Sequence, residues 1–223
     1  FVQMDRAKLH RLFELDIPED KHARESLVKD VMAAAVKPGQ NARPSVEAPL
    51  HDLLKRTYVV HTHAVLVNGM TCAKNGFVTC RKLFPDALWV PYIDPGFTLC
   101  VDVNKRIANY RRETGREPDI IILENHGIFV SGDTPVEIRA HYRRVCKSLD
   151  DQYAAAGISR ELKYGSPTLS GEIVELEGIL KSLLGNDAAH IAACAPFRIA
   201  AGPISPDHIV YSKSFAYDGP LND

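Results

Sequence analysis

The stretch that decides the fold is Ile120-Ile121-Ile122-Leu123-Glu124-Asn125-His126-Gly127. Four consecutive apolar residues predict a short strand that is buried on both faces, as strands in the middle of a sheet are. The polar turn that follows begins where the chain leaves the sheet, so His126 is expected at a strand end. A histidine at that position can meet other side chains gathered at the same place.

Two further histidines end another predicted strand, Tyr58-Val59-Val60-His61-Thr62-His63. Side chains two apart on a strand point to the same face, so both imidazoles can reach one ion. With His126 they predict a three-nitrogen metal site with one coordination position free, as in catalytic rather than structural zinc sites. Alternatively, these are ordinary hydrogen-bonded histidines of the core, because a chain with nine histidines has several that serve no metal. The pattern alone does not choose the reaction, because hydrolases and oxygenases also use histidine clusters.

A carboxylate lies shortly before the histidine pair, in Pro44-Ser45-Val46-Glu47-Ala48-Pro49-Leu50-His51. This segment and the histidine motifs, together with Val67-Asn68-Gly69 and Pro91-Tyr92-Ile93-Asp94-Pro95-Gly96, resemble the class II aldolase/adducin family. The likeness is greatest to its zinc-dependent aldolases for rhamnulose 1-phosphate, including the aldolase portion of bifunctional aldolase/dehydrogenases, and for fuculose 1-phosphate. It runs from about Arg43 to about Tyr142, and its motifs are specific to the superfamily rather than to one substrate.

The resemblance implies a role for each matching residue. It makes Glu47 the acid/base group beside the metal and Ser45 a contact for the substrate phosphate. Where the family often has a second serine, this chain has Val46, which leaves phosphate recognition with one hydroxyl fewer. The metal ligands that the resemblance implies are His61, His63 and His126.

The chemistry of carbon–carbon cleavage beside a ketone fits these roles. The reaction leaves an enediolate, and a zinc ion with a free position stabilises the negative charge on its two oxygens. Glu47 can carry the proton at the reacting carbon if its surroundings tune its pKa. The alternative for Glu47 is a solvated carboxylate at a helix start. His51, four residues later, is interpreted as a structural residue or as a neighbour that supports the ligands.

Two features of the family pattern have no counterpart. Some members use a tyrosine as proton donor about twenty residues beyond the histidine pair, but none stands between Ala73 and Leu83. The family's phosphate-binding turns are also missing before Arg43, and they are expected in a segment preceding Phe1. A neighbouring subunit is therefore expected to complete each site, in a homo-oligomer that the resemblance makes a tetramer.

The predicted architecture is α/β, a three-layer α/β/α domain with a central, largely antiparallel sheet, as the resemblance implies. Residues 1–185 are expected to form the metal-binding domain and residues 186–223 a C-terminal extension packed on it. Thr134 and Glu137 form a predicted capping box at the start of a long helix. The remaining patterns predict helices at 21–36, 50–56, 63–73, 98–112, 134–156 and 170–184 and further strands at 87–92, 127–130 and 208–212.

The predicted function is a zinc-dependent lyase that cleaves a ketose 1-phosphate to dihydroxyacetone phosphate and an aldehyde. Family relatives that epimerise, dehydrate or decarboxylate sugar phosphates use the same metal-bound enolate and stay open as alternatives. An adducin-like interaction module is a non-catalytic alternative, although the metal histidines are present here. A metallohydrolase is a third alternative.

Composition excludes several other classes. The 223 residues are 45% hydrophobic and 25% charged, which is enough to bury one sizeable core. The net charge of -1 gives no electrostatic reason to expect nucleic acid or acidic membranes as partners. No apolar stretch spans a bilayer, and no signal peptide is recognisable. Reduced core thiols in a cytoplasmic protein are expected from five cysteines without a Cys-x-x-Cys pair: Cys72, Cys80, Cys100, Cys146 and Cys194.

Overall fold

The computed structural model describes residues 2–159, 171–190, 201–203, 205, 208, 209, 211 and 213. The chain forms two compact units, residues 1–151 and 152–223, and each is described by itself. The second unit contains α8 (Gly171–Leu184) and the short 3-10 helix η2 (Gly185–His190). The predicted division after residue 185, with a tail packed on the core, stays a prediction.

Among the described residues, the first unit holds a four-stranded sheet in the order β1-β4-β3-β2. The strands β1 (Tyr58–Thr62) and β3 (Ile120–Leu123) both run antiparallel to β4 (Gly127–Gly132), whereas β2 (Leu88–Val90) pairs parallel to β3. The prediction of a largely antiparallel sheet is confirmed. All four residues of β3 are buried, because this strand has a neighbour on each side and helices over both faces.

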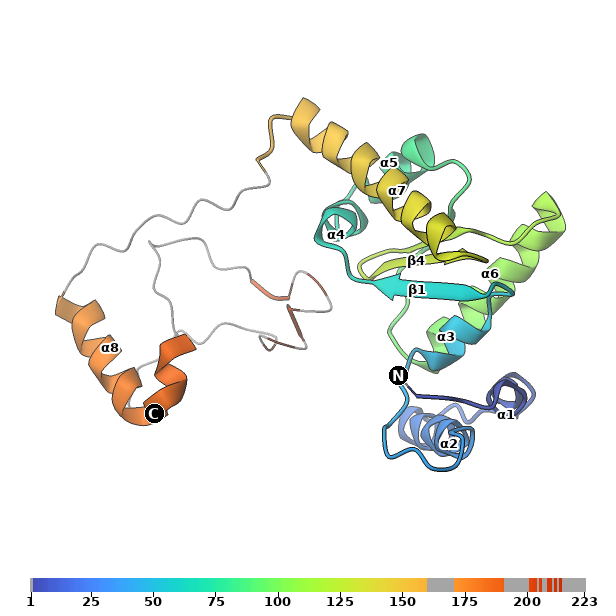
Figure 1. The fold of residues 1–223 in the computed structure, drawn as a ribbon, viewed down its shortest axis with the longest axis horizontal. Coiled ribbons are helices and arrows are strands. Elements are labelled where there is room, and N and C mark those ends of the chain that lie inside the picture. The colour runs from blue at the N-terminus through green and yellow to red at the C-terminus, as the bar shows by residue number, and fades with distance from the viewer. Residues whose placement is uncertain are drawn as a thin grey trace. The chain divides into compact units, whose positions relative to one another are not determined.

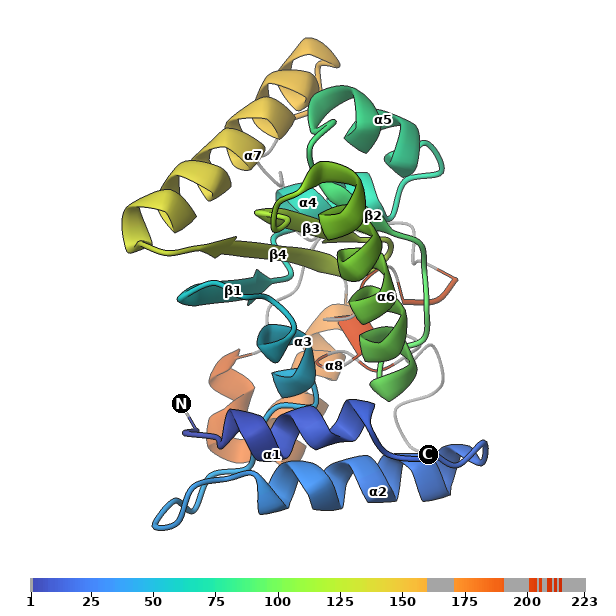
Figure 2. The same cartoon turned by 90° about the vertical axis from the view of Figure 1, so that its right-hand side faces the viewer.

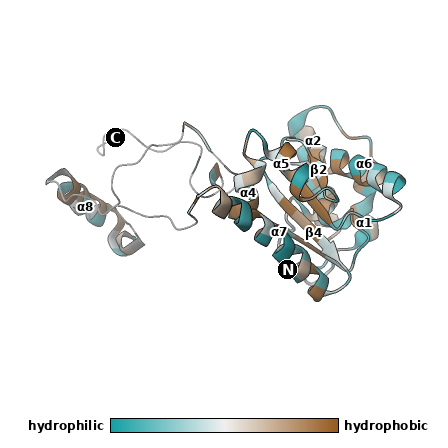
Figure 3. Cartoon of the chain, turned by 90° about the horizontal axis from the view of Figure 1, so that it is seen from above, coloured by the Kyte–Doolittle hydropathy of each residue, from teal (hydrophilic) through white to brown (hydrophobic). Residues whose placement is uncertain are grey.

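Helices cover both faces of the sheet, which makes the fold a three-layer α/β/α sandwich as predicted (Figure 1 and Figure 2). The hydrophobic residues follow the strands between the layers (Figure 3). One helical layer contains α4 (Val65–Thr71), α5 (Gly76–Leu83) and α7 (Pro135–Ala155). On the opposite face α3 (Ala48–Asp52) and α6 (Phe97–Thr114) lie against the sheet, and α1 (Arg6–His10), the 3-10 helix η1 (Arg11–Phe13) and α2 (Lys21–Ala34) pack beyond them (Figure 1).

The main core lies between the sheet and this second layer. Side chains that alternate along the strands, such as Ile121, Leu123 and Phe129, share one apolar cluster with Leu50 of α3 and Phe97 of α6. This burial fixes the register of the sheet, because a shift of one residue would turn the apolar set to the other face. The register in turn sets which face each histidine of β1 occupies.

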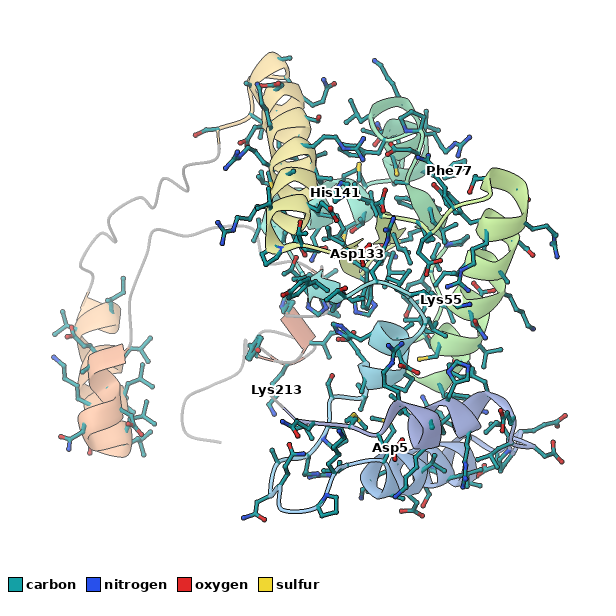
Figure 4. All side chains as sticks on the ribbon, turned by 45° about the vertical axis from the view of Figure 1, so that its right-hand side comes forward. Asp5, Lys55, Phe77, Asp133, His141 and Lys213 are labelled. Carbon is teal, nitrogen blue, oxygen red and sulfur yellow. The ribbon has the colours of Figure 1, made fainter. Side chains whose placement is uncertain are left out.

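The start of α7 has the predicted capping box, with one change. The Thr134 hydroxyl accepts the backbone N–H of Glu137 at 3.2 Å, as expected. The Glu137 carboxylate accepts the backbone N–H of Asp133 at 2.7 Å, one residue earlier than the standard pairing. Asp133 also pairs with Arg56 at 2.7 Å, which ties the turn between β4 and α7 to the segment before β1. Figure 4 labels Asp133 in this turn and Lys55, the residue before Arg56.

Three sequence interpretations need correction. No helix was predicted for the residues of α5, which lie between the predicted helix at 63–73 and the predicted strand at 87–92. Gly76 begins the helix, and an added Cβ would lie 2.4 Å from the Met70 carbonyl oxygen. The predicted strand at 208–212 is wrong for its described residues: His208 and Ile209 are helical, and the Ser205 hydroxyl accepts the His208 N–H as a helix cap would. Cys72 is exposed rather than a core thiol.

All four described cysteines are free; Cys80 and Cys100 are buried, as predicted for core thiols, whereas Cys146 is half-buried. Burial raises the pKa of Cys80 to about 11 and that of Cys100 to about 12, so both stay protonated at neutral pH. Cys194 lies outside the described residues. None of the described helices combines the length and apolar character that crossing a bilayer requires.

Candidate metal centre

Four side chains from three separate segments converge beside the sheet. Glu47 stands directly before α3, His61 and His63 lie at the end of β1, and His126 lies in the turn between β3 and β4. One potential ligand atom of each lies within 4.8 Å of the corresponding atom of every other. All four residues were predicted as site residues, and the structure brings them together.

The shortest separations between donor atoms are close to what a tetrahedral metal requires. His61 Nε2 lies 3.0 Å from His63 Nε2, and Glu47 Oε1 lies 3.0 Å from His126 Nε2 and 3.4 Å from His61 Nε2. Two ligands bound at zinc distances of roughly 2.0–2.1 Å in a tetrahedron are themselves about 3.3 Å apart. Zinc therefore fits this donor set, and so do other divalent transition metals that accept imidazole.

The orientation of His61 leaves the required nitrogen available. Its Nδ1 lies 3.0 Å from the backbone carbonyl oxygen of Ile128. A carbonyl only accepts, so Nδ1 carries a proton, and Nε2, which faces the shared position, is the nitrogen that can bind a metal when it gives up its own proton. The ring also stacks on Phe129, with centroids 4.1 Å apart. The hydrogen bond and the stacking together hold the imidazole before any ligand arrives.

Opposing effects act on the Glu47 carboxyl. Burial raises its pKa, but hydrogen bonds to His126 and His61 and the charges of these imidazoles together outweigh burial and hold the pKa well below its usual range. Glu47 is thus a carboxylate at neutral pH. It can accept a proton or serve as a fourth ligand, and its interpretation as a solvated helix-start residue does not match these contacts.

His51 supports the site from outside the donor set. Its Nδ1 lies 3.1 Å from the carbonyl oxygen of Val59, and its ring packs edge-on against Phe129 at 5.3 Å and His61 at 6.4 Å. Burial lowers the pKa of His51, so the ring is neutral and donates to Val59. This agrees with the expected structural role.

The His126 turn depends on features that the sequence analysis did not identify. Asn125 adopts a left-handed backbone with φ of 55°, which asparagine tolerates better than most residues. Its N–H donates to the Thr71 carbonyl at 3.2 Å, and the Glu124 N–H donates to the Val90 carbonyl at 2.9 Å. These bonds to α4 and to the end of β2 fix where His126 projects. The Asn-His-Gly motif was the sequence signal from which this turn could have been predicted.

Gly127 leaves no space for a side chain beside the histidines. An added Cβ would lie 2.6 Å from the Thr62 carbonyl oxygen and 3.0 Å from His63 Cδ2. The Thr62 carbonyl belongs to the backbone between His61 and His63, so it cannot move without moving these two histidines. Glycine is required here by close packing.

Replacing Gly127 with alanine is therefore expected to destabilise the fold by about 1–3 kcal/mol, the usual cost of overpacking, and to weaken metal binding because His63 must shift. Thermal unfolding with and without added zinc measures both effects. Gly178→Ala is the control, since nothing lies within 4 Å of an added Cβ there and alanine favours a helix. Equal stability and equal zinc response of the two variants would contradict the close-packing argument.

Tyr142 of α7 contacts the ligand strand from the opposite face. Its hydroxyl lies 3.0 Å from Thr62 Oγ1 and 3.4 Å from the Val60 carbonyl oxygen. Thr62 stands between the two histidines and points away from them, because neighbouring side chains alternate on a strand. Tyr142 therefore fixes the strand and does not reach the reacting atoms.

Ser45 lies two residues before Glu47 and is exposed. Its hydroxyl oxygen accepts the backbone N–H of Glu47 at 3.2 Å. Its hydroxyl proton stays available for an anion, in keeping with the predicted phosphate contact, although that role stays a prediction.

Comparison with known proteins connects this geometry to a family. Residues 2–152 match the "Class II Aldolase and Adducin N-terminal domain". The chain is 24% identical over 222 residues to the "Uncharacterized oxidoreductase YuxG" of Bacillus subtilis (strain 168), with 88% of this chain and 31% of that protein covered. The chain thus spans about a third of the length of that relative.

A solved structure shows a similar fold. An N-terminal class II aldolase domain of a conserved protein from Thermoplasma acidophilum superposes with a TM-score of 0.53 at 22% identity, covering 68% of this chain and 64% of that one. An aldolase II superfamily protein from Pseudomonas syringae gives a TM-score of 0.40 at 17% identity, covering 70% and 62%. The matched residues 2–152 include the complete sheet and all four converging side chains, and the chain belongs to the class II aldolase/adducin family.

Proposed function

We propose that this chain is a metal-dependent aldehyde-lyase that cleaves a ketose 1-phosphate to dihydroxyacetone phosphate and an aldehyde. The observation that carries the proposal is the position of Glu47 Oε1, 3.0 Å from His126 Nε2 and 3.4 Å from His61 Nε2. A proton carrier thus lies against an all-histidine metal site. Aldol cleavage needs this combination, because negative charge must be stabilised on the substrate while a proton is transferred at an adjacent atom.

A divalent ion, zinc in this proposal, would be held by His61, His63 and His126 and would supply Lewis-acid stabilisation of negative charge on the substrate. The residues of the chain supply position and proton transfer. Glu47 Oε1, ionised at neutral pH, accepts the proton that the substrate hydroxyl loses as the carbon–carbon bond breaks, and returns a proton to the new carbanion carbon.

The site also excludes water from part of its surroundings. His126 is 7% exposed and lies among buried residues of β3 and β4. In such a setting, hydrogen bonds and charges act more strongly than in bulk water. The convergence of all four side chains also favours an enzyme over an adducin-like module.

A substrate panel tests the proposal. Protein reconstituted with zinc is incubated with phosphorylated ketoses and phosphorylated sugar acids, and dihydroxyacetone phosphate is measured by coupled reduction. Release of dihydroxyacetone phosphate with a matching aldehyde is expected, and it should stop on chelation and return with zinc. An epimerised, dehydrated or decarboxylated product would assign one of the alternative family activities instead, and hydrolysis alone would indicate a metallohydrolase.

We further propose that the protein works as a homo-oligomer, most simply a tetramer, in which a neighbouring subunit completes each site. Val46 and Val65 support this, because they flank Glu47 and His63 and are 70% and 87% exposed. A partner covering these side chains would remove apolar surface from water at the site. Light scattering on active protein is expected to give a multiple of the chain mass, and a fully active monomer would refute the assembly.

A further inference from the structure

The short helix α3 carries a buried carboxylate that faces α1 rather than the metal centre. The Asp52 side chain is only 4% exposed, although an ionised carboxylate is costly to remove from water. Two residues of α1, which lies beside α3 (Figure 2), offset this cost. Arg6 Nε bonds one carboxylate oxygen, and His10 Nδ1 lies 3.2 Å from the other. Asp52 is thus tied to α1 by both of its oxygens.

Arg6 also bonds the backbone of the same residue. Its Nη2 donates to the Asp52 carbonyl oxygen at 3.1 Å, one of the carbonyls that a helix leaves without a partner at its C-terminal end. The planar guanidinium thus holds the side chain and the main chain of Asp52 at once, and this two-point contact accepts only a narrow range of orientations. The end of α3 is therefore fixed against α1 in direction as well as in position.

The other end of α3 begins at Glu47. The Glu47 carbonyl oxygen accepts the N–H of Leu50 at 2.9 Å and that of His51 at 3.2 Å, so the main chain of Glu47 moves with the helix. Asp52 lies five residues further on, about 7.5 Å along a helix axis. Over so short a helix, a tilt or rotation at the Asp52 end displaces Glu47 directly. Glu47 Oε1 is 3.0 Å from His126 Nε2, and a hydrogen bond weakens steeply when its distance or angle departs from the optimum.

Apolar packing alone leaves α3 freer than these polar contacts do. Leu9 of α1 and Leu50 of α3 belong to one apolar cluster, but the hydrophobic effect has no direction and tolerates small shifts. The net stability that a buried ion pair contributes is small, because desolvation offsets most of the attraction. The Asp52 contacts therefore matter for the arrangement of α3 more than for the free energy of unfolding.

We propose that Asp52 is a positioning residue for Glu47: held by Arg6 and His10, it fixes α3 so that the Glu47 carboxylate lies against the histidines of the metal centre. The inference rests on the proposed function and deepens it, because it adds a residue that governs the proton carrier without touching substrate. Removing the charge of Asp52 releases the C-terminal end of α3 from α1. Glu47 then occupies a wider range of positions, and fewer of them suit proton transfer.

Replacing Asp52 with asparagine tests this, because asparagine keeps the size of the side chain and removes its charge. Arg6 is itself exposed and returns to water, so the variant is expected to fold. Zinc content and KM should stay near wild type while kcat falls by about tenfold or more, because catalysis is sensitive to displacements of about an ångström. Arg6→Gln breaks the same contact from its exposed partner and should lower kcat in the same way.

Asp86→Asn is the matched control. It breaks another carboxylate–arginine pair, with Asp86 oxygens 3.0 and 2.8 Å from Arg144 of α7, and no residue of α1 or α3 takes part. This variant should keep the wild-type kcat. A wild-type kcat in Asp52→Asn, or an equal loss of kcat in Asp86→Asn, would overturn the proposal.

The visible absorption spectrum of protein loaded with cobalt gives a measurement that needs no turnover, since it depends on the geometry of the groups around the ion. Asp52→Asn is expected to alter the spectrum in the same direction as Glu47→Gln, and Asp86→Asn to leave it unchanged. A wild-type spectrum in Asp52→Asn, or a change that Glu47→Gln does not share, would also overturn the proposal. An altered spectrum of the expected kind in a protein that cleaves no ketose phosphate would support the positioning of Glu47 and refute the lyase.

Discussion

Replacing His126 with alanine is expected to lower bound metal from about one ion per chain to near zero and turnover by more than about a thousandfold. The expected loss exceeds that of a single transition-state hydrogen bond, about 10²–10³, because the whole Lewis acid leaves with the ligand. Two imidazoles alone do not make the three-ligand set of catalytic zinc sites. Elemental analysis and the lyase assay on the same sample measure both effects.

His22→Ala is the control for His126→Ala, since His22 is an exposed histidine of α2. It should retain wild-type metal and turnover. Removing His126 also takes away the 3.0 Å partner of Glu47, so the folded state should be checked by circular dichroism. A folded His126→Ala protein with full metal content would show that His126 is not a ligand.

Replacing Glu47 with glutamine is expected to keep metal content near wild type while lowering turnover by on the order of a hundredfold or more, the usual scale of a lost acid/base group. Glutamine has the same shape and can still contact His126, but its amide does not carry the proton. Metal analysis and steady-state kinetics separate the two roles. Loss of metal in this variant would identify Glu47 as a required ligand.

Glu113→Gln controls for the loss of one negative charge, because Glu113 is an exposed glutamate near the end of α6. It should match the wild type in metal content and in rate. Unchanged turnover in Glu47→Gln with full metal would remove Glu47 from the mechanism and, with it, the observation on which the proposed function rests.

The convergence of the metal-binding side chains could be predicted because it follows from local rules. Period-two alternation places His61 and His63 on one face, and the run Ile120–Leu123 had to be a central strand because all four residues are apolar. Strand ends that meet at one edge then bring His126 to them. None of these steps depends on how distant helices pack.

Features that depend on tertiary packing could not be predicted in the same way. The start of α5 requires glycine at Gly76 because an added Cβ would lie 2.4 Å from the Met70 carbonyl oxygen, a contact that only the packing of α4 against α5 creates. A cavity of ≈ 720 Å³ is lined by both Arg6 and Arg43, which are distant in the sequence, and it forms only through the packing of the N-terminal segment near α3. The left-handed Asn125 became evident only with its bond to Thr71.

Anomalous diffraction at the zinc absorption edge, from crystals of zinc-loaded protein, tests the metal centre most directly. We expect one strong peak per chain within roughly 2.0–2.1 Å of a ring nitrogen of each of His61, His63 and His126, with Glu47 beside it. Divergent imidazoles with no peak between them, or a peak held by other residues, would contradict the account.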